Sequence, residues 1–496
     1  MTRSPRWYDI ITINIFYLGL TTLTQTMVPL VLPLLVQQFV GQTQQGAYYG
    51  RLRLYALMAA LLSQALMGML SDRSTLRWGR RRPFIFAGAL LDLAVLMAIG
   101  FSARMSGLAG YWFLFALYVL LQFFSNTAHS AQQGFIPDIV PEEKRGRYSA
   151  VKALFEVPVP VVLVSFTIAR LVGAGNMWGG LLVLMAVLLI TMLLAMLIPE
   201  KPLDALPPPL DWQPFLRLLL MTGLFTAIIL VMGEIVTLTG RLLACVESVA
   251  VLLVAMGGIG FAAMAVAVVV GVGSGFRVSV GAEKSRAIAP FVWWVISRLA
   301  FLVSVTNLGG FVLYFLQARL GFTRESAAGP ASQMMMLVGV FILISAFPAG
   351  WLVDRVGRKR VVAWSGMIAA AGTAIILFAV NLTLVFVGGC IIGMATGIFY
   401  TASWALGTSL VPEGEAGRYL GISNLAGAGA GAIGAYIGGP VADFFTRSTP
   451  DVPGLGYVLL FAIYGLLFVL STLLLAKVQE PVPQEKPGLV PVFHFF

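Results

Sequence analysis

One face of an apolar stretch between residues 111 and 134 carries side chains suited to binding hydroxyl groups. Tyr118, Gln122, Asn126, His129 and Gln133 recur every three or four residues, which places them on one side of a helix. Amides and hydroxyls both donate and accept hydrogen bonds, and aromatic rings can cover the apolar face of a ligand ring. The stripe therefore predicts a cavity for a neutral, polyhydroxylated small molecule. The alternative is hydrogen bonding between helices, worth about 0.6 kcal/mol per bond in membranes.

Other apolar stretches carry polar groups that would line the same cavity. Asn14 and Gln25 lie in the first stretch, Asn307 lies in a later one, and Tyr400 and Trp404 share a face of another. The predicted substrate-binding residues are therefore Asn14, Gln25, Gln122, Asn126, His129, Gln133, Asn307, Tyr400 and Trp404. We interpret His129 as a neutral hydrogen-bonding member of this set rather than as a proton relay.

Three ionisable residues inside apolar stretches are candidates for coupling transport to an ion: Glu156, Asp92 and Arg298. Glu156 comes first because it precedes two prolines that should kink its helix and let water and ligand reach it. The kink could be a hinge or a broken-helix site, or only a bend. Glu156 also follows Lys152 by one turn, so the two charges could simply neutralise each other. Arg298 could bind a ligand anion or pair with Asp92 or Glu156.

The chain contains the same charged loop twice. Residues 68–83 read GMLSDRSTLRWGRRRP and residues 350–360 read GWLVDRVGRKR; residues 141–148 read PEEKRGRY and residues 412–419 read PEGEAGRY. We predict a cytoplasmic gate in which these arginines pair with acids such as Glu142, Glu143, Glu413 and Glu415, the alternative being attraction to anionic lipid. The predicted gate residues are Asp72, Arg73, Arg80, Asp354, Arg355, Arg358, Arg147 and Arg418.

Composition indicates a multi-pass helical membrane protein. The chain is 59% hydrophobic and 11% charged, with a mean hydropathy of +0.91. The net charge of +11 does not indicate nucleic-acid binding, because the basic residues lie in short loops between apolar stretches. Cys245 and Cys390 lie in apolar stretches and predict no disulfide framework. We expect no cofactor, no metal site and no enzymatic activity.

The apolar stretches number about fourteen, and Lys and Arg concentrate on one side of them. This asymmetry predicts that both termini are cytoplasmic in a plasma (inner) membrane protein. The expected domains are residues 1–198, a six-helix bundle; residues 199–288, a linker with an inserted transmembrane hairpin; residues 289–478, a second six-helix bundle; and residues 479–496, a disordered cytoplasmic tail. An in-plane or re-entrant hairpin is the alternative for the insert.

The two charged loops and their order resemble the major facilitator superfamily, across both halves of the chain. SDRSTLRWGRRRPFIFAGA, RWYDIITINIFYLGL, FSNTAHSAQQGFIPDIVP and EAGRYLGISN resemble its sucrose:proton symporter branch, within the glycoside-pentoside-hexuronide:cation symporters. The resemblance implies an all-α membrane fold of two six-helix bundles, here with an inserted helix pair, around a central cavity for a glycoside-like substrate.

Two positions depart from that branch. Its members carry an acid four residues before an Asn-Thr pair and an arginine seven residues after that Asn, where this chain has Gln122 and Gln133. Proton coupling is therefore not carried over by the resemblance. We expect a secondary transporter for a sugar or glycoside, working by cation-coupled uptake; the alternatives are a drug-type exporter of amphipathic compounds and a non-transporting receptor-like relative. We also expect a monomer whose partners are a small-molecule substrate, a proton or sodium ion as the coupling ion, and membrane lipids.

Overall fold

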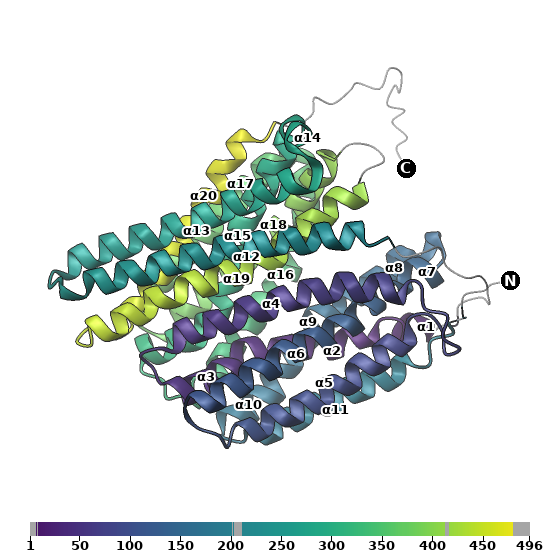
Figure 1. Ribbon diagram of the computed structural model, residues 1–496, viewed down its shortest axis with the longest axis horizontal. Helices are drawn as coiled ribbons and strands as arrows, with labels where there is room; N and C mark the ends of the chain where they lie inside the picture. The colour runs from purple at the N-terminus through teal and green to yellow at the C-terminus, as the bar shows by residue number, and fades with distance from the viewer. Residues whose placement is uncertain (1–5, 7, 201, 203–210, 412–415, 480–496) are drawn as a thin grey trace, which may run out of the picture.

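The structure is a computed structural model that describes residues 6, 8–200, 202, 211–411 and 416–479 (Figure 1). In this part of the chain, helices make up all the regular secondary structure. Thirteen helices or helix runs in this part of the chain are long and apolar enough to cross a membrane. The 33-residue helix α19 (Ala416–Ser448) is a further long helix. The predicted all-α fold is confirmed, and the chain is an integral multi-pass membrane protein.

The first half of the molecule, residues 9–198, contains six membrane-spanning runs. The first consists of α1 (Asp9–Thr12), α2 (Ile15–Thr26), the π-helical turn η1 (Met27–Val31) and α3 (Leu32–Val40). The second, third and sixth runs are the single helices α4 (Gln45–Ser71), α5 (Arg82–Ser102) and α11 (Met177–Ala195). The fourth run is α6 (Gly107–Gln133) followed by α7 (Phe135–Ile139). The fifth consists of α8 (Arg145–Glu156), α9 (Pro158–Leu163), the π-helical turn η3 (Val164–Ile168) and α10 (Ala169–Gly173).

The second half, residues 289–478, repeats this plan after an inserted pair of helices. The pair is α12 (Gln213–Leu242) and α13 (Val249–Val280), and the short α14 (Ala282–Ala287) leads into the second half. There follow α15 (Ala289–Leu320), α16 (Ala328–Val356), α17 (Arg358–Leu377), α18 (Leu382–Ser409), α19 and α20 (Leu455–Leu474). Residues 480–496, which include almost all of the predicted tail, lie outside the described part of the chain.

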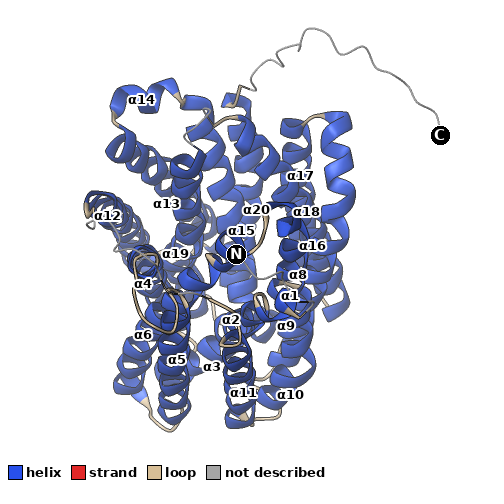
Figure 2. Ribbon diagram, turned by 90° about the vertical axis from the view of Figure 1, so that its right-hand side faces the viewer, coloured by secondary structure: helices blue, strands red, loops and turns tan. Residues whose placement is uncertain are grey.

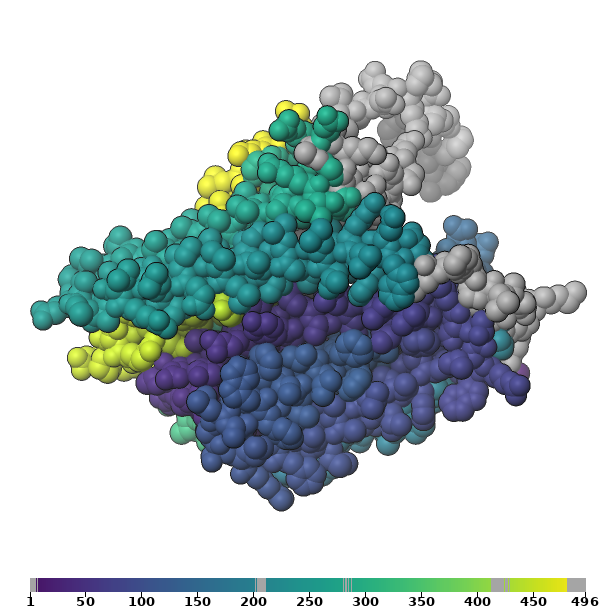
Figure 3. All heavy atoms as spheres, viewed as in Figure 1, coloured from purple at the N-terminus to yellow at the C-terminus, as the bar shows by residue number. Residues whose placement is uncertain are grey.

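Figure 2 views the molecule along its helices and shows α2 of the first half opposite α15 of the second. We call the end that holds Asp9, Asp72 and Asp354 the proximal end, and the end that holds Val40 and Gln45 the distal end. The inserted α12 and α13 pack on α19, and α13 also contacts α15 and α20. Figure 3 shows this pair covering one side of the molecule above α4 and α6.

The predicted proline break in the fifth run is present. Helix α8 ends at Glu156, Val157 has non-helical backbone angles, and α9 begins at Pro158. Proline lacks the amide that would continue the hydrogen-bond ladder, so the helix stops at this point. The break places Glu156 at a helix end in the interior of the first half.

Candidate functional site

A cavity of about 400 Å³ lies within the first half, between α2, α4, α6 and α8. Gln122, Asn126 and His129 of the predicted stripe line it, and so does Glu156. The rest of its lining is Tyr17, Leu20, Thr21, Thr24, Leu57, Ala60, Leu61, Gln64 and Ser125. Amides, hydroxyls, one imidazole and one carboxylate therefore share this space with an aromatic ring, a combination that suits a polyhydroxylated ligand.

The stripe continues at one edge of the cavity. Gln64 donates to the amide oxygen of Gln133 over 3.3 Å, and the Gln133 amide nitrogen lies 3.2 Å from Nε2 of His129. The Asn126 amide donates to the Gln122 carbonyl over 2.8 Å. Among the described residues only the nitrogen of Asn126 makes a hydrogen bond, which leaves its amide oxygen able to accept one from a ligand hydroxyl.

A charged pair forms another part of the wall. Nζ of Lys152 lies 3.4 Å from Oε1 of Glu156 and 4.6 Å from the ring centroid of Tyr17. The Tyr17 ring meets His129 edge-on at 6.0 Å, and its buried hydroxyl makes no hydrogen bond within the described residues. Glu156 is thus both paired with a cation and in contact with the cavity.

Asn14, Gln25 and Asn307 are placed away from this cavity. Asn14 is 0% exposed and donates to the carbonyls of Ile10 and Tyr148. Asn307 donates to the carbonyls of Val303 and Ala430, which joins α15 to α19. Gln25 is half-buried on α2. Both asparagines hold helices together in this conformation.

Asp92 of α5 is 0% exposed and lies where α5 packs against α6. One of its carboxyl oxygens accepts a hydrogen bond from Ser125 over 3.1 Å, and the other has no partner among the described residues. Ser125 also lines the cavity. Asp92 therefore sits one layer behind the wall and reaches the cavity only through this hydroxyl.

In the second half, Arg298, Tyr400 and Trp404 lie together between α15 and α18. The Arg298 guanidinium carbon is 5.4 Å from the ring centroid of Trp404 and 5.6 Å from that of Trp294. Tyr400 and Trp404 are 41% and 42% exposed. Helices α15 and α18 are the first and fourth spans of their half, so these residues correspond in position to the cavity wall formed by α2 and α6.

Four of the described proximal charges form a cluster within the first half. Arg81 binds Asp72 over 2.8 Å and Asp138 over 2.6 Å, and Arg80 also pairs with Asp138. Arg81 and Asp138 were not among the predicted gate residues, although Arg81 belongs to the duplicated basic run. Gly134 permits this packing, since a Cβ there would overlap the guanidinium group of Arg81.

Glu200 completes this cluster by capping α5. Its carboxylate accepts hydrogen bonds from the backbone amides of Arg81 and Arg82 at 2.8–3.0 Å, at the positive end of the helix. Burial raises the pKa of the Glu200 carboxyl, and the amide hydrogen bonds and nearby arginines oppose that rise. The end of α11 is thereby fixed to the start of α5.

The second copy of the charged loop is arranged differently. Asp354 is exposed and forms no ion pair within the described part of the chain, and Arg355 lies 4.0 Å from the ring centroid of Trp351. Arg358 and Arg147 are exposed, and so are Glu142 and Glu143; Arg73 is half-buried. Arg418, Glu413 and Glu415 lie outside the residues whose side chains are described. The four ion pairs in which both partners are described residues lie within the first half.

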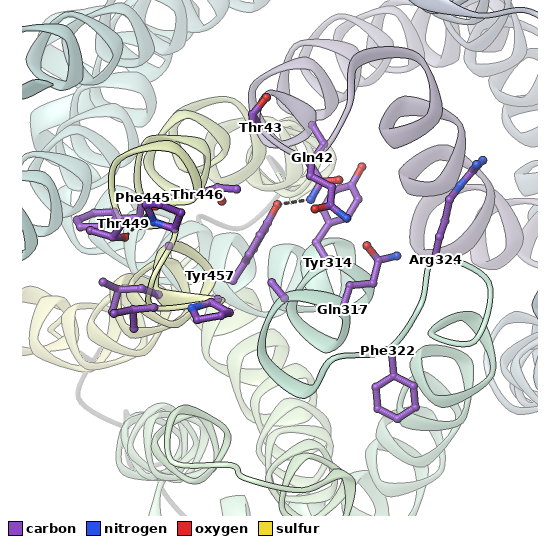
Figure 4. A pocket seen from close by; sticks show the side chains of 18 of the residues that line it. Gln42, Thr43, Tyr314, Gln317, Phe322, Arg324, Phe445, Thr446, Thr449 and Tyr457 are labelled. Carbon is purple, nitrogen blue, oxygen red and sulfur yellow. Dashed lines mark hydrogen bonds between the residues drawn. The ribbon is translucent and has the colours of Figure 1, made fainter.

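At the distal end the two halves are joined by hydrogen bonds that the sequence did not predict. Gln37 donates to Gln317 over 2.9 Å, Arg324 donates to Gln38 over 2.7 Å, and Tyr314 donates to the Pro33 carbonyl over 2.9 Å. Gln45 donates to the Tyr457 hydroxyl over 2.8 Å. Figure 4 shows Tyr314, Gln317 and Tyr457 around a pocket of about 380 Å³ at this junction.

Asp443 of α19 joins the two halves through hydrogen bonds to backbone amides. Its side chain is 1% exposed, and its two oxygens accept hydrogen bonds from the backbone amides of Gly46 and Ala47 at 2.8 and 2.7 Å. An acid from the second half thus caps the first turn of α4 in the first half, where the helix dipole favours negative charge.

Glycines let α4 and α19 approach closely enough for this cap. A Cβ on Gly50 would overlap the Ala435 carbonyl, and one on Gly439 would overlap the Gly46 carbonyl. The same interface encloses Arg53, which is 4% exposed and lies 5.9 Å from the ring centroid of Tyr49. The distal contact is therefore a closely packed, hydrogen-bonded junction between the halves.

Comparison with known proteins shows partial sequence similarity to membrane transporters and a similar overall fold. The model of the Major Facilitator Superfamily matches residues 294–494. The chain is 32% identical over 129 residues to the minor myo-inositol transporter IolF of Bacillus subtilis, covering 26% of this chain and 28% of that protein. It is 32% identical over 98 residues to the sucrose transport protein SUT1 of Oryza sativa subsp. japonica, covering 16% and 18%.

These matches span less than a third of the length of the curated relatives. Solved structures match over nearly the whole chain at low identity. A peptide transporter of the POT family, described as auto-inhibited, gives a TM-score of 0.65 at 13% identity over 97% of this chain and 99% of its own. The nucleoside transporter NupG gives 0.57 at 14% identity over 95% and 100%. The solved structures show the fold alone, and the family-model and sequence matches confirm the expected resemblance to the superfamily.

Proposed function

We propose that this protein, whose fold and motifs are those of the Major Facilitator Superfamily, is a secondary transporter for a sugar or glycoside-like small molecule. The observation that carries the proposal is the cavity in the first half. Gln122, Asn126 and His129 offer three neutral polar groups along one helix face, and Tyr17 offers an aromatic ring beside them. The partial sequence matches to myo-inositol and sucrose transporters support a polyhydroxylated substrate.

Alternating access requires the two halves to close at one end while the other opens. The distal hydrogen bonds and the Asp443 cap support a conformation closed at the distal end. At the proximal end, the ion pairs between described residues lie within the first half. The basic loops at the proximal end favour a cytoplasmic orientation for it, which makes this conformation the inward-facing one.

We further propose that uptake is coupled to a cation, with Glu156 as the coupling group. Glu156 lines the cavity and pairs with Lys152, so loss or gain of a proton there would change the charge next to the substrate. Asp92 ranks second because it reaches the cavity only through Ser125.

The proposal is tested by substrate binding and uptake with purified protein in liposomes. A panel of sugars, polyols and glycosides is screened for an increase in melting temperature, and a compound that raises it is then measured for uptake with and without a pH or sodium gradient. Asn126→Ala and Gln122→Ala should each weaken binding of that compound about tenfold, as expected for loss of one or two ligand hydrogen bonds.

Gln213→Ala is the matched control, because Gln213 is an exposed amide at the start of α12, outside the cavity. It should bind and transport as the wild type does. Unchanged affinity in both cavity variants would show that the stripe only joins helices, and the proposed site would be wrong.

A further inference from the structure

Two arginines at the distal end line a cleft of about 460 Å³ between the first half, the inserted helices and the second half. Arg241 lies in the last turn of α12 and Arg447 in the last turn of α19, and both are exposed. The negative ends of the two helices favour a cation at these positions but supply no counter-ion. The Arg447 Nε atom donates to the Asp443 carbonyl over 3.3 Å, and neither arginine forms an ion pair with a described residue.

The acids in and around this cleft do not balance the two arginines. Asp443 lines the cleft, but its buried carboxylate caps the first turn of α4. Glu234 of α12 accepts a hydrogen bond from the Tyr436 hydroxyl over 3.2 Å. Glu247 and Asp451, in the adjoining distal loops, form no ion pair within the described part of the chain.

A third cation, Arg51 of α4, lies beside the cleft. Its guanidinium carbon is 5.5 Å from the ring centroid of Tyr48, which lines the cleft, and it also forms no ion pair with a described residue. Lys and Arg concentrate on the opposite, proximal side of this protein, so three arginines around one distal cleft stand out. Even with Asp443 counted, the surroundings of the cleft are net positive.

The cleft has a polar rim and an apolar floor, and its walls come from both halves. The exposed polar residues of the rim include Gln44, which precedes α4 in the first half, and Arg241 and Arg447. The buried floor includes the apolar residues Val236, Met256 and Phe444. Figure 3 shows the inserted pair lying along α4 on the surface of the molecule. A ligand in this cleft therefore contacts both halves at the distal junction.

Next to the cleft, α12 has an apolar face that the rest of the protein leaves uncovered. Val231, Ile235, Leu238 and Leu242 recur every three or four residues and are 41–73% exposed. Because α12 is long and apolar enough to cross a membrane, this face meets acyl chains. The arginines lie at the distal end of this span, at the level where the headgroups of a bilayer begin. A phospholipid places an anionic phosphate at that level and its acyl chains along the apolar face.

We propose that this cleft binds the phosphate of a phospholipid headgroup and that the bound lipid stabilises the conformation closed at the distal end. Arg241 and Arg447 donate charge-assisted hydrogen bonds to the phosphate oxygens, and Gln44 adds a neutral donor from the first half. Because the cleft has walls from both halves, their separation at the distal end removes part of the site. A ligand that binds one conformation better than another shifts the equilibrium towards it. The lipid is thus a regulatory ligand, whichever solute the protein transports.

Lipid binding is tested on the purified full-length protein by native mass spectrometry in detergent. Phosphatidylglycerol is compared with digalactosyl diacylglycerol, which has acyl chains but no phosphate, and with glycerol phosphate, which has the phosphate but no acyl chains. The wild type should bind its first phosphatidylglycerol about tenfold or more tightly than either of the other two, since hydrogen bonds to charged groups are among the stronger ones. The double variant Arg241→Gln/Arg447→Gln should lose this preference.

Arg104→Gln is the matched control for the loss of a distal charge. Arg104 is an exposed arginine after α5 that lies 5.6 Å from the ring centroid of Phe101, outside the cleft. This variant should keep the preference of the wild type for phosphatidylglycerol. The single variants Arg241→Gln and Arg447→Gln, each with a loss of about threefold, replace the double variant if it does not fold.

The effect on conformation is measured in lipid nanodiscs as the distance between spin labels at the exposed distal residues Ser106 and Glu325. Replacing the galactolipid by phosphatidylglycerol should increase the distal-closed population in the wild type and in Arg104→Gln, but not in the double variant. Equal affinity of the wild type for the two lipids, or an unchanged preference in the double variant, would overturn the site. Glycerol phosphate that binds as tightly as phosphatidylglycerol would show that the cleft takes a free anion and not a lipid. A lipid preference without any change in the distance would overturn the regulatory role.

Discussion

Gln37 and Gln317 occupy the same position in the two halves and are hydrogen-bonded to each other. The runs Asp9–Val40 and Ala289–Leu320 both contain 32 residues, and each glutamine is the twenty-ninth residue of its run. Nε2 of Gln37 lies 2.9 Å from Oε1 of Gln317. The internal repeat thus brings its own equivalent residues into contact at the distal junction.

A double-mutant cycle should detect this contact. Gln37→Ala and Gln317→Ala should each make the free energy of distal closure less favourable. The loss in the double variant should be smaller than the sum of the two single losses by about 0.5 kcal/mol, a typical value for a hydrogen bond between membrane helices. Closure is followed as the distance between spin labels at the exposed positions Thr43 and Glu325. Strict additivity would mean that the two amides do not stabilise the closed conformation through each other.

Replacing Asp443 by alanine should shift the protein away from distal closure. Gly46 and Ala47 would lose the acceptor for their buried amides, a cost of about 0.5–2 kcal/mol for a helix cap. The same spin-label distance should then show a larger open population. Asp451→Ala, at an exposed acid in the loop after α19, serves as the control and should behave as the wild type does.

Gly50→Ala should impair distal closure by steric overlap. The added Cβ would meet the Ala435 carbonyl, and overpacking of this kind costs about 1–3 kcal/mol. Uptake should slow while binding from the distal side is kept. Gly146→Ala is the matched control, because Gly146 is helical and exposed and a Cβ there meets no neighbour within 4 Å. Normal uptake by Gly50→Ala would show that α4 and α19 can separate without loss.

Glu156→Gln should separate accumulation from exchange. A fixed neutral side chain cannot release a proton, so gradient-driven accumulation should be lost, while exchange of labelled for unlabelled substrate should continue. Counterflow in liposomes measures both. Accumulation by this variant would show that Glu156 is not the coupling group. If the wild type responds to neither pH nor sodium, the protein is a uniporter.

Asp72→Asn should slow transport more than Asp354→Asn. Asp72 is bonded to Arg81, whereas Asp354 forms no ion pair within the described residues. Because the Asp72 side chain is 56% exposed, the pair should contribute only about 0.2–1 kcal/mol, so the rate should fall by less than about fivefold. Substrate affinity should be unchanged in both variants. Equal rates in Asp72→Asn and the wild type would argue against a role in gating.

The sequence predicts the role of a residue better when that role depends on the geometry of one helix than when it depends on how two helices pack. Gln122, Asn126 and His129 share a face because helical periodicity fixes their relation, and all three line the cavity. Asn14 and Asn307 look equally polar in the sequence, yet each bonds a carbonyl of a neighbouring helix, and that depends on how the helices rotate against each other. Asp443 was missed because its partner Gly46 is 397 residues away.

The inserted helices give the two halves unequal outlines in the plane of the membrane. Helix α13 packs on α15, α19 and α20, and α12 packs more extensively on α19 than on α4 of the first half. We therefore expect the pair to move with the second half, which then has eight spans in contact with lipid or with one another against six in the first. Moving a wider body through a viscous bilayer meets more drag. During each cycle the first half, with the cavity and Glu156, should therefore tilt most relative to the surrounding lipid, and bilayer thickness or viscosity should influence the turnover rate through that half.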